Sequence, residues 1–168
     1  MKNDFHTCFS NFPILPNSII EEANNSNYKK CEHPYSFSAV AMAIRDTVFY
    51  KNLSSVFGDI SADYIKNEPN SLYDWHTDFN RSCSVNWVIK TSPSAFTFFR
   101  SNRREPFFWD LEQVKYDLYK PTVLDTTKNH CIINNHHKER IIMSISIYKK
   151  KAYNDVVDYF KNLSIDSY

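Results

Sequence analysis

Short strand-like runs dominate the sequence after Gly58 and limit the folds that the chain can adopt. Turn-forming clusters such as Glu68-Pro69-Asn70 separate these runs. The expected strands cover residues 62–66, 72–77, 83–90, 95–100, 114–119, 121–125, 130–134 and 140–148. Because no helical periodicity intervenes, the pattern predicts antiparallel β structure closed into a barrel or jelly roll.

Helical patterns flank the strands on both sides. Pro16-Asn17-Ser18 precedes Ile19 and predicts a helix start with a small polar cap. Residues 36–54 carry apolar side chains at spacings of three and four, which predict a helix that covers a sheet. These side chains are Phe37, Val40, Ala41, Ile44 and Val48. A terminal helix is expected over residues 152–163.

The chain length is typical of one domain with a single core. We therefore expect the 168 residues to form a helical part over about 1–60, a β core over about 61–148 and a C-terminal helix. No internal repeat or low-complexity linker divides them.

The charge balance does not favour nucleic acid or a membrane surface as a partner, because the net charge is only +1. Arg100, Arg103 and Arg104 form a local basic cluster. Three charges in one segment are more typical of a solvated loop than of a nucleic-acid site.

The four cysteines form no C-x-x-C pair, so the sequence predicts neither a zinc knuckle nor a redox motif. No segment is long and apolar enough to span a bilayer. We expect a reducing cytoplasm as the compartment. Abundant Asn, Lys, Ile, Tyr and Phe suggest an AT-rich genome, such as that of a phage, in which case the compartment is the host cytoplasm.

His76 and Asp78 stand two residues apart at the end of an expected strand, where period-two alternation points both side chains to one face. His130 opens a later strand, and its parity with Ile132 and Asn134 directs it inward. Two imidazoles and one carboxylate are suitable ligands for Fe(II). His136 and His137 compete with His130 for the third position, but they lie in an Asn-rich turn.

Arg140 and Ser144 differ by four positions, so on a strand they share a face. A buried arginine needs an anion, since an unpaired buried charge costs several kcal/mol. Its partner is either a bound acid or a protein carboxylate such as Asp125 or Glu139. Further pocket candidates are Asn86, Tyr73 and Tyr64, each of which could equally be core.

The residues His76-x-Asp78, His130 and Arg140-x-x-x-Ser144 together resemble the motif of the 2-oxoglutarate and Fe(II)-dependent oxygenases. The segments at 130–134 and 140–145 look most like the aspartyl/asparaginyl and prolyl hydroxylases, especially small phage-type members. The resemblance covers roughly residues 64–147. It departs from the nucleic-acid demethylases, which have a second arginine shortly after the first.

The resemblance implies a double-stranded β-helix that is cupin-like, with His76, Asp78 and His130 as iron ligands. It also implies that Arg140 binds the distal carboxylate of 2-oxoglutarate and that Ser144 donates its hydroxyl. The expected reaction uses dioxygen to hydroxylate an amino-acid side chain in a peptide, a protein or free form.

Two alternatives stay open at this point. One is the same chemistry on a small metabolite or nucleotide, and the other is a β-barrel that serves only as an interaction module. The sequence does not identify the oligomeric state. An apolar lid over residues 101–110, with Pro106, Phe107, Phe108 and Trp109, is a candidate for substrate selection, although these side chains could also cover a small core.

Overall fold

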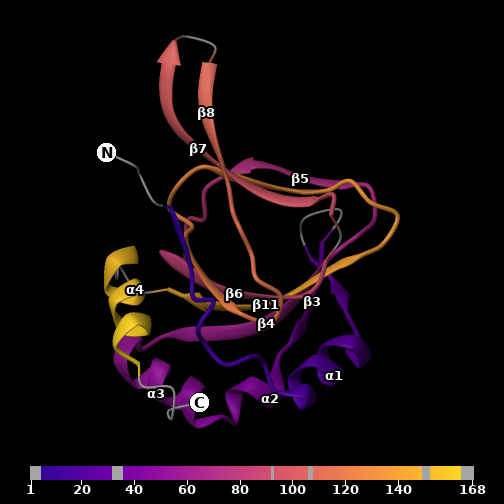
Figure 1. Cartoon of the computed structure of the whole chain (residues 1–168). Coiled ribbons are helices and arrows are strands. Elements are labelled where there is room, and N and C mark those ends of the chain that lie inside the picture. Colours follow the sequence, from indigo (N-terminus) through magenta and orange to yellow (C-terminus); the bar gives the residue numbers. More distant parts are fainter. Residues whose placement is uncertain (1–4, 32–35, 92, 106–107, 149–151, 164–168) are drawn as a thin grey trace.

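Two facing antiparallel sheets form the body of the protein (Figure 1). The computed structural model describes residues 5–31, 36–91, 93–105, 108–148 and 152–163. The larger sheet has seven strands in the order β1 (His6–Cys8), β9 (Pro121–Asp125), β6 (Cys83–Lys90), β11 (Arg140–Ile147), β4 (Ile60–Asn67), β3 (Ser36–Val40) and β2 (Lys29–Lys30). The smaller sheet has four strands in the order β5 (Ser71–His76), β10 (His130–Asn134), β7 (Ala95–Glu105) and β8 (Phe108–Gln113). This arrangement is the double-stranded β-helix, so the predicted fold class is confirmed.

Strand β11 shows how one sequence supplies both a core and a cavity. Its alternate residues Ile141, Met143 and Ile145 belong to the main hydrophobic core. The other residues of the alternation, Arg140, Ile142, Ser144 and Ser146, line a cavity between the two sheets. Because strand side chains alternate, the larger sheet is apolar toward its outer side and largely polar toward the smaller sheet.

Four helices of the described segments lie along the outer side of the larger sheet (Figure 1). They are α1 (Asn17–Asn25), α2 (Met42–Arg45), α3 (Val48–Phe57) and α4 (Tyr153–Asn162). Phe49 of α3 meets Trp87 of β6 edge to face, with ring centroids 6.0 Å apart. Phe160 of α4 packs against the same Phe49 ring at 5.9 Å. The helices therefore seal the apolar side of the sheet with aromatic contacts.

The expected helices near the two ends are present, although their capping differs from expectation. Helix α1 begins at Asn17 behind Pro16 and makes no side-chain cap hydrogen bond. Helix α3 begins after Thr47, whose side chain accepts a hydrogen bond from the Tyr50 amide. Proline suits the first turn because its missing N–H would have no helical partner there.

The predicted helix over residues 36–54 is wrong in its first part. Ser36–Val40 is strand β3, which pairs with β4 in antiparallel register from Ser36↔Asn67 to Val40↔Asp63. The remainder divides into α2 and α3 around Asp46 and Thr47. Phe37 and Val40 fit a strand as well as a helix, and the free edge of β4 decides between them through backbone hydrogen bonds.

Two other expectations fail around the smaller sheet. Residues 114–119 form no regular strand: Leu118 makes an isolated parallel bridge with Val88, and Tyr119 takes a positive φ of 62°, which turns the chain. Within the expected lid segment, residues 101–105 belong to β7 and residues 108–110 to β8, and these two strands pair and project beyond the barrel (Figure 1). Pro106 and Phe107 of the expected lid lie outside the described residues.

All four cysteines fall within the described segments, and all are free thiols. Burial raises the pKa of the Cys83 thiol to about 12, which leaves it protonated and unreactive. Among the helices of the described segments, none combines the length and apolar character needed to cross a bilayer.

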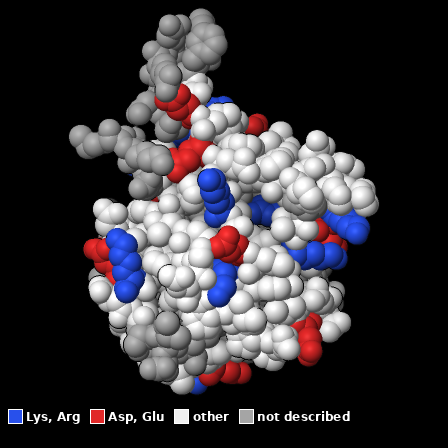
Figure 2. Space-filling model, viewed as in Figure 1, with Lys and Arg blue, Asp and Glu red and all other residues white. Residues whose placement is uncertain are grey.

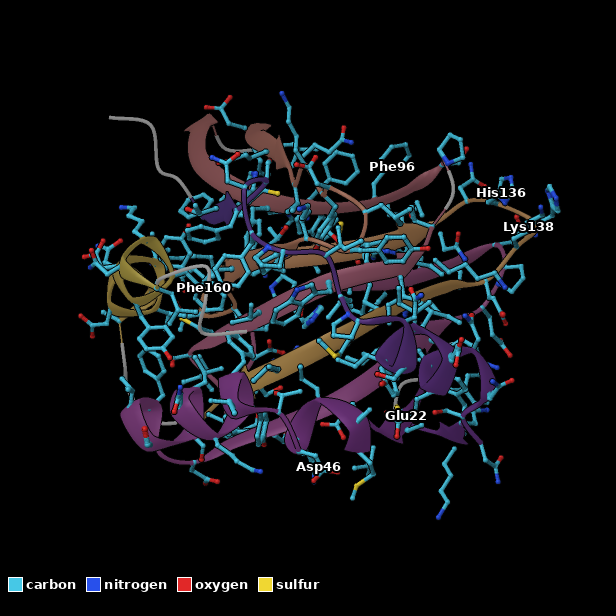
Figure 3. The ribbon with its side chains drawn as sticks, turned by 60° about the horizontal axis from the view of Figure 1, so that its bottom comes forward. Glu22, Asp46, Phe96, His136, Lys138 and Phe160 are labelled. Atoms are coloured by element: carbon cyan, nitrogen blue, oxygen red, sulfur yellow. The ribbon has the colours of Figure 1, made fainter. Side chains whose placement is uncertain are left out.

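The aromatic contacts of Phe160 predict a large loss of stability on truncation. Phe160 faces the sheet from α4 (Figure 3) and touches Phe9, Phe12 and Phe49. Phe160→Ala should lower the free energy of unfolding by about 3–5 kcal/mol, because it removes a buried ring and leaves a cavity. The matched control is Phe79→Ala, because the ring of Phe79 is fully exposed. Its free energy of unfolding, measured with urea, should equal that of the wild type. Equal stability of the two variants would contradict the packing described here.

Candidate active site

A cavity of about 460 Å³ lies between the two sheets. The inner face of the larger sheet contributes Asp63, Asn86, Arg140 and Ser144 to its lining. The smaller sheet contributes Tyr73, Thr97, His130 and Ile132. A cavity of this size is typical of small-molecule sites.

Three candidate residues converge at the edge of this cavity, whose lining includes Asp78 and His130. His76, Asp78 and His130 each offer a ligand atom, and these atoms all lie within 4.8 Å of one another. The antiparallel register of β5 and β10 pairs His76 directly with His130. Asp78 follows β5, and its amide donates to the Thr126 carbonyl at 3.0 Å. Strand pairing and one loop hydrogen bond thus assemble two imidazoles and a carboxylate.

Backbone carbonyls orient both imidazole rings. Nδ1 of His76 lies 2.7 Å from the Asp74 carbonyl oxygen, and Nδ1 of His130 lies 2.9 Å from that of Lys128. Because a carbonyl only accepts, each Nδ1 carries the proton and each Nε2 carries the lone pair. His76 Nε2 is buried and has no hydrogen-bond partner among the described residues. The lone pairs of the two Nε2 atoms are therefore available to bind a metal.

Aromatic neighbours and burial also favour ligation. The Tyr73 ring stacks on His76 with centroids 3.9 Å apart, and Phe99 packs 5.4 Å from His130. Burial lowers the pKa of His130 to about 4. His130 is consequently neutral near pH 7, and neutral imidazole is the form that binds a metal.

Arg81 holds the aspartate of this group. Its Nε donates to Asp78 Oδ2 at 2.6 Å, and its Nη1 donates to Ser146 Oγ at 3.0 Å. Asp78 Oδ1 is then the oxygen nearest His76, 3.9 Å from its Nε2. A charged hydrogen bond of this kind fixes which carboxylate oxygen faces the centre.

Arg140 places a buried positive charge in the same cavity. Its side chain is only 1% exposed. Nη2 donates to Thr97 Oγ1 at 3.3 Å, and the guanidinium lies 5.2 Å from the Tyr116 ring centroid. Nε and Nη1 are buried without a partner among the described residues. Such a group costs several kcal/mol unless an anion binds it.

The protein carboxylates considered as partners for Arg140 are engaged elsewhere. Glu139 pairs with Lys90 at 2.8 Å and with Lys66 at 3.9 Å, and the hydrogen bond from Lys90 holds the pKa of Glu139 below its usual range. Asp125 accepts a hydrogen bond from the Thr127 hydroxyl. The unsatisfied donors of Arg140 therefore fit a bound acid better than a protein side chain.

The other candidates divide into two groups. Ser144, Asn86 and Tyr73 line the cavity together with Arg140. Tyr64 does not, because its parity on β4 points it toward α1, where its hydroxyl donates to Glu22 Oε2 at 2.6 Å and also lies 3.1 Å from the Ile19 carbonyl oxygen. This placement corrects the expectation that Tyr64 lines the pocket. His136 lies with His137 in the turn before β11, and neither belongs to the cavity lining or to the group of His76, Asp78 and His130.

Four cavity residues escaped the sequence reasoning. Arg81 and Asp63 belong to none of the motifs found in the sequence. Thr97 shares the inward parity of Phe99 on β7, which the strand pattern could have revealed. Tyr116 lies outside the strands and left no sequence signal.

Within the basic cluster, the structure describes the side chain of Arg100, whereas those of Arg103 and Arg104 lie outside the described side chains. The Arg100 guanidinium lies 4.2 Å from the ring centroid of Trp75 and 5.3 Å from that of Trp109, so aromatic rings engage its charge. The face drawn in Figure 2 places basic and acidic side chains next to one another instead of gathering one sign.

Comparisons with known proteins establish the fold. No family model matches the chain, and no curated protein does. A prolyl hydroxylase of Trichoplax adhaerens in complex with a hypoxia inducible factor peptide fragment superposes with a TM-score of 0.65 at 8% identity, over 96% of this chain and 89% of that one. An oxidoreductase of the 2OG-Fe(II) oxygenase family from Burkholderia pseudomallei gives 0.61 at 8% identity, over 90% and 88%. HygX from Streptomyces hygroscopicus, with nickel and 2-oxoglutarate bound, gives 0.60 at 9% identity, over 87% and 83%.

The site geometry predicts which histidine binds a metal. His130→Ala should weaken Mn(II) binding by more than about 100-fold, since even the loss of a group that orients a ligand costs 10- to 100-fold. His137→Ala removes an imidazole from the neighbouring turn and should bind as the wild type does. Calorimetric titration measures both variants, and equal losses would refute the ligand assignment.

Proposed function

We propose that the chain is an Fe(II)- and 2-oxoglutarate-dependent dioxygenase that hydroxylates an amino-acid side chain in a peptide, a protein or free form. The observation that carries the proposal is the unsatisfied buried guanidinium of Arg140, in the same cavity as Asp78 and His130, which group with His76. A scaffold that only binds partners needs neither feature. A structural neighbour with nickel and 2-oxoglutarate bound supports the pairing of metal and diacid.

The donor set fits ferrous iron. Two neutral imidazoles and one carboxylate on one side of a metal leave neighbouring coordination positions open. When bound, Fe(II) and 2-oxoglutarate supply the oxidative chemistry: dioxygen, 2-oxoglutarate and a substrate C–H bond give succinate, carbon dioxide and the C–OH product. The protein itself has to hold the metal, orient both organic molecules and exclude water.

Arg140 would bind the distal carboxylate of 2-oxoglutarate. Its planar guanidinium offers paired N–H donors that match a carboxylate. Thr97 and Tyr116 keep it in place, since the Thr97 hydroxyl accepts from Arg140 and lies 3.3 Å from the Tyr116 hydroxyl. The Ser144 hydroxyl lies four residues farther along the same strand, about 13 Å away, so it faces the part of the cavity beyond the carboxylate that Arg140 would hold. Ile142 lies between the two on the cavity lining and offers apolar contact to the methylene groups.

The remaining lining would orient the substrate. Tyr73 covers His76, and Asn86 presents an amide beside Ser144. The exposed ring of Phe79 directly follows Asp78, where it could contact an incoming chain. The neighbour from Trichoplax adhaerens is described with a peptide fragment, which supports an amino-acid side chain as the acceptor class.

Anaerobic titration with Fe(II) and 2-oxoglutarate tests the shared chemistry. The proposal predicts a charge-transfer absorption band that needs both components, followed by dioxygen-dependent succinate release when a substrate is present. Release with peptides or amino acids supports the proposed substrate class, and release only with metabolites or nucleotides contradicts it. Absence of both band and succinate refutes the enzyme.

Arg140→Met separates cosubstrate binding from metal binding. The variant should lose 2-oxoglutarate affinity by at least about 30-fold, because removing one partner of a buried charge pair costs about 2–5 kcal/mol. Its Mn(II) affinity should stay at the wild-type value, since Arg140 touches none of the ligands. Titration of the charge-transfer band of the Fe(II) chelate measures the affinity for 2-oxoglutarate. Calorimetry measures the affinity for Mn(II). Unchanged 2-oxoglutarate affinity would refute the role of Arg140.

A further inference from the structure

A row of polar residues crosses the inner face of the larger sheet next to the metal candidates. Thr122 of β9 pairs in register with Asn86 of β6, Asn86 with Ser144 of β11, and Ser144 with Asp63 of β4. We refer to Thr122, Asn86, Ser144 and Asp63 as the polar row. Its members Asn86, Ser144 and Asp63 line the cavity.

Asp63 brings a negative charge into the cavity that no cation of the described residues neutralises within ion-pair distance. Its one hydrogen bond comes from the Ser61 hydroxyl, which donates to Oδ2 at 3.0 Å. Because that hydroxyl has only one proton, the Tyr148 hydroxyl, 2.8 Å from Ser61 Oγ, must be the donor to Ser61. Hydroxyl groups thus hold Asp63 in place without cancelling its charge.

Arg81 is the cavity-lining cation to consider as a partner of Asp63. Its guanidinium is directed instead to Asp78 and to Ser146. Lys66, on the same strand as Asp63, pairs with Glu139. The negative charge of Asp63 consequently stays available to a molecule in the cavity.

Asn86 adds an independent sign of a missing donor. The residue is 6% exposed, and its Oδ1 is buried with no hydrogen-bond partner among the described residues. A buried acceptor that lacks a donor is unfavourable, because it has lost its hydrogen bonds to water without replacement. The polar row therefore presents an amide oxygen and a carboxylate. Both are hydrogen-bond acceptors that N–H donors of a bound molecule would satisfy.

The polar row is separate from the position of Arg140. Ile142 and Ile65 pair in register between them and also line the cavity. Four residues along β11 correspond to about 13 Å of strand. The cavity therefore carries a positive charge toward one end, suited to a diacid, and a negative charge farther along.

We propose that Asp63, assisted by Asn86, binds a cationic nitrogen of the substrate, so that the hydroxylated molecule bears an ammonium or guanidinium group such as a lysine or arginine side chain. The inference rests on the proposed function, because the recognised group belongs to the molecule that is hydroxylated. A carboxylate with an adjacent amide oxygen matches these donors in charge and geometry. A site built for such donors rejects analogues that lack them.

Binding of three probes tests this specificity: the N-acetyl methylamides of lysine, norleucine and glutamate. Calorimetry measures their affinity for the protein with Fe(II) and 2-oxoglutarate under nitrogen. Lysine should bind at least about tenfold more tightly than norleucine, which has a similar chain without the charge, and glutamate should bind most weakly. Equal affinities for lysine and norleucine would overturn the proposal.

Asp63→Asn assigns the effect to the residue. It should reduce lysine affinity at least about tenfold, leave norleucine affinity unchanged and keep the charge-transfer band. Asp46→Asn makes the same charge change at an exposed position among the helices, away from the cavity (Figure 3), and should behave as the wild type.

Two outcomes would overturn the assignment to Asp63. The lysine preference could survive in Asp63→Asn, or that variant could lose the band, which would show that Asp63 balances Arg81 at the metal ligands. These two outcomes for Asp63→Asn are distinguishable from failure of the proposed function. In that case the wild-type protein itself shows no charge-transfer band, whatever its preference among the probes.

Discussion

Period-two alternation in the larger sheet is the constraint on which the rest of the structure depends. On β11, Ile141, Met143 and Ile145 enter the core beneath the helices, while Arg140 and Ser144 enter the cavity. The apolar side supplies the favourable free energy of folding. It can offset the cost of keeping an unsatisfied arginine and asparagine inside the barrel. The two faces therefore have separate tasks, and a slip by one residue would exchange them.

The smaller sheet fixes the positions of the candidate metal ligands rather than adding to the main hydrophobic core. Direct pairing of His76 with His130 sets the distance between the imidazoles, and backbone carbonyls set their orientation. Arg81 then ties Asp78 to Ser146 of the opposite sheet. Rigid positioning of this kind is what a metal centre requires, because small displacements of its ligands cost much of the affinity and activity.

The sequence could predict what local spacing encodes. His76-x-Asp78, the inward parity of His130 and the shared face of Arg140 and Ser144 all follow from strand alternation. The structure places Asp78, His130, Arg140 and Ser144 on the lining of one cavity, with His76 beside the first two. Tyr64 was misplaced because its face depends on register: it pairs with Met143 in the core, whereas its neighbour Asp63 pairs with Ser144 at the cavity. Strand β3 was mistaken for helix because its pairing with β4 is non-local. Arg81 and Tyr116 reach the site through loops, and loop conformation leaves little trace in spacing.

The central claim is that one cavity holds a metal on three side chains and a diacid on Arg140. A crystal structure of the protein grown with Mn(II) and 2-oxoglutarate tests it most directly. The account predicts the metal on Nε2 of His76 and His130 and on Asp78, with the far carboxylate of the diacid on the Arg140 guanidinium. Metal bound at other residues, or a diacid that leaves Arg140 without an anion, would contradict it.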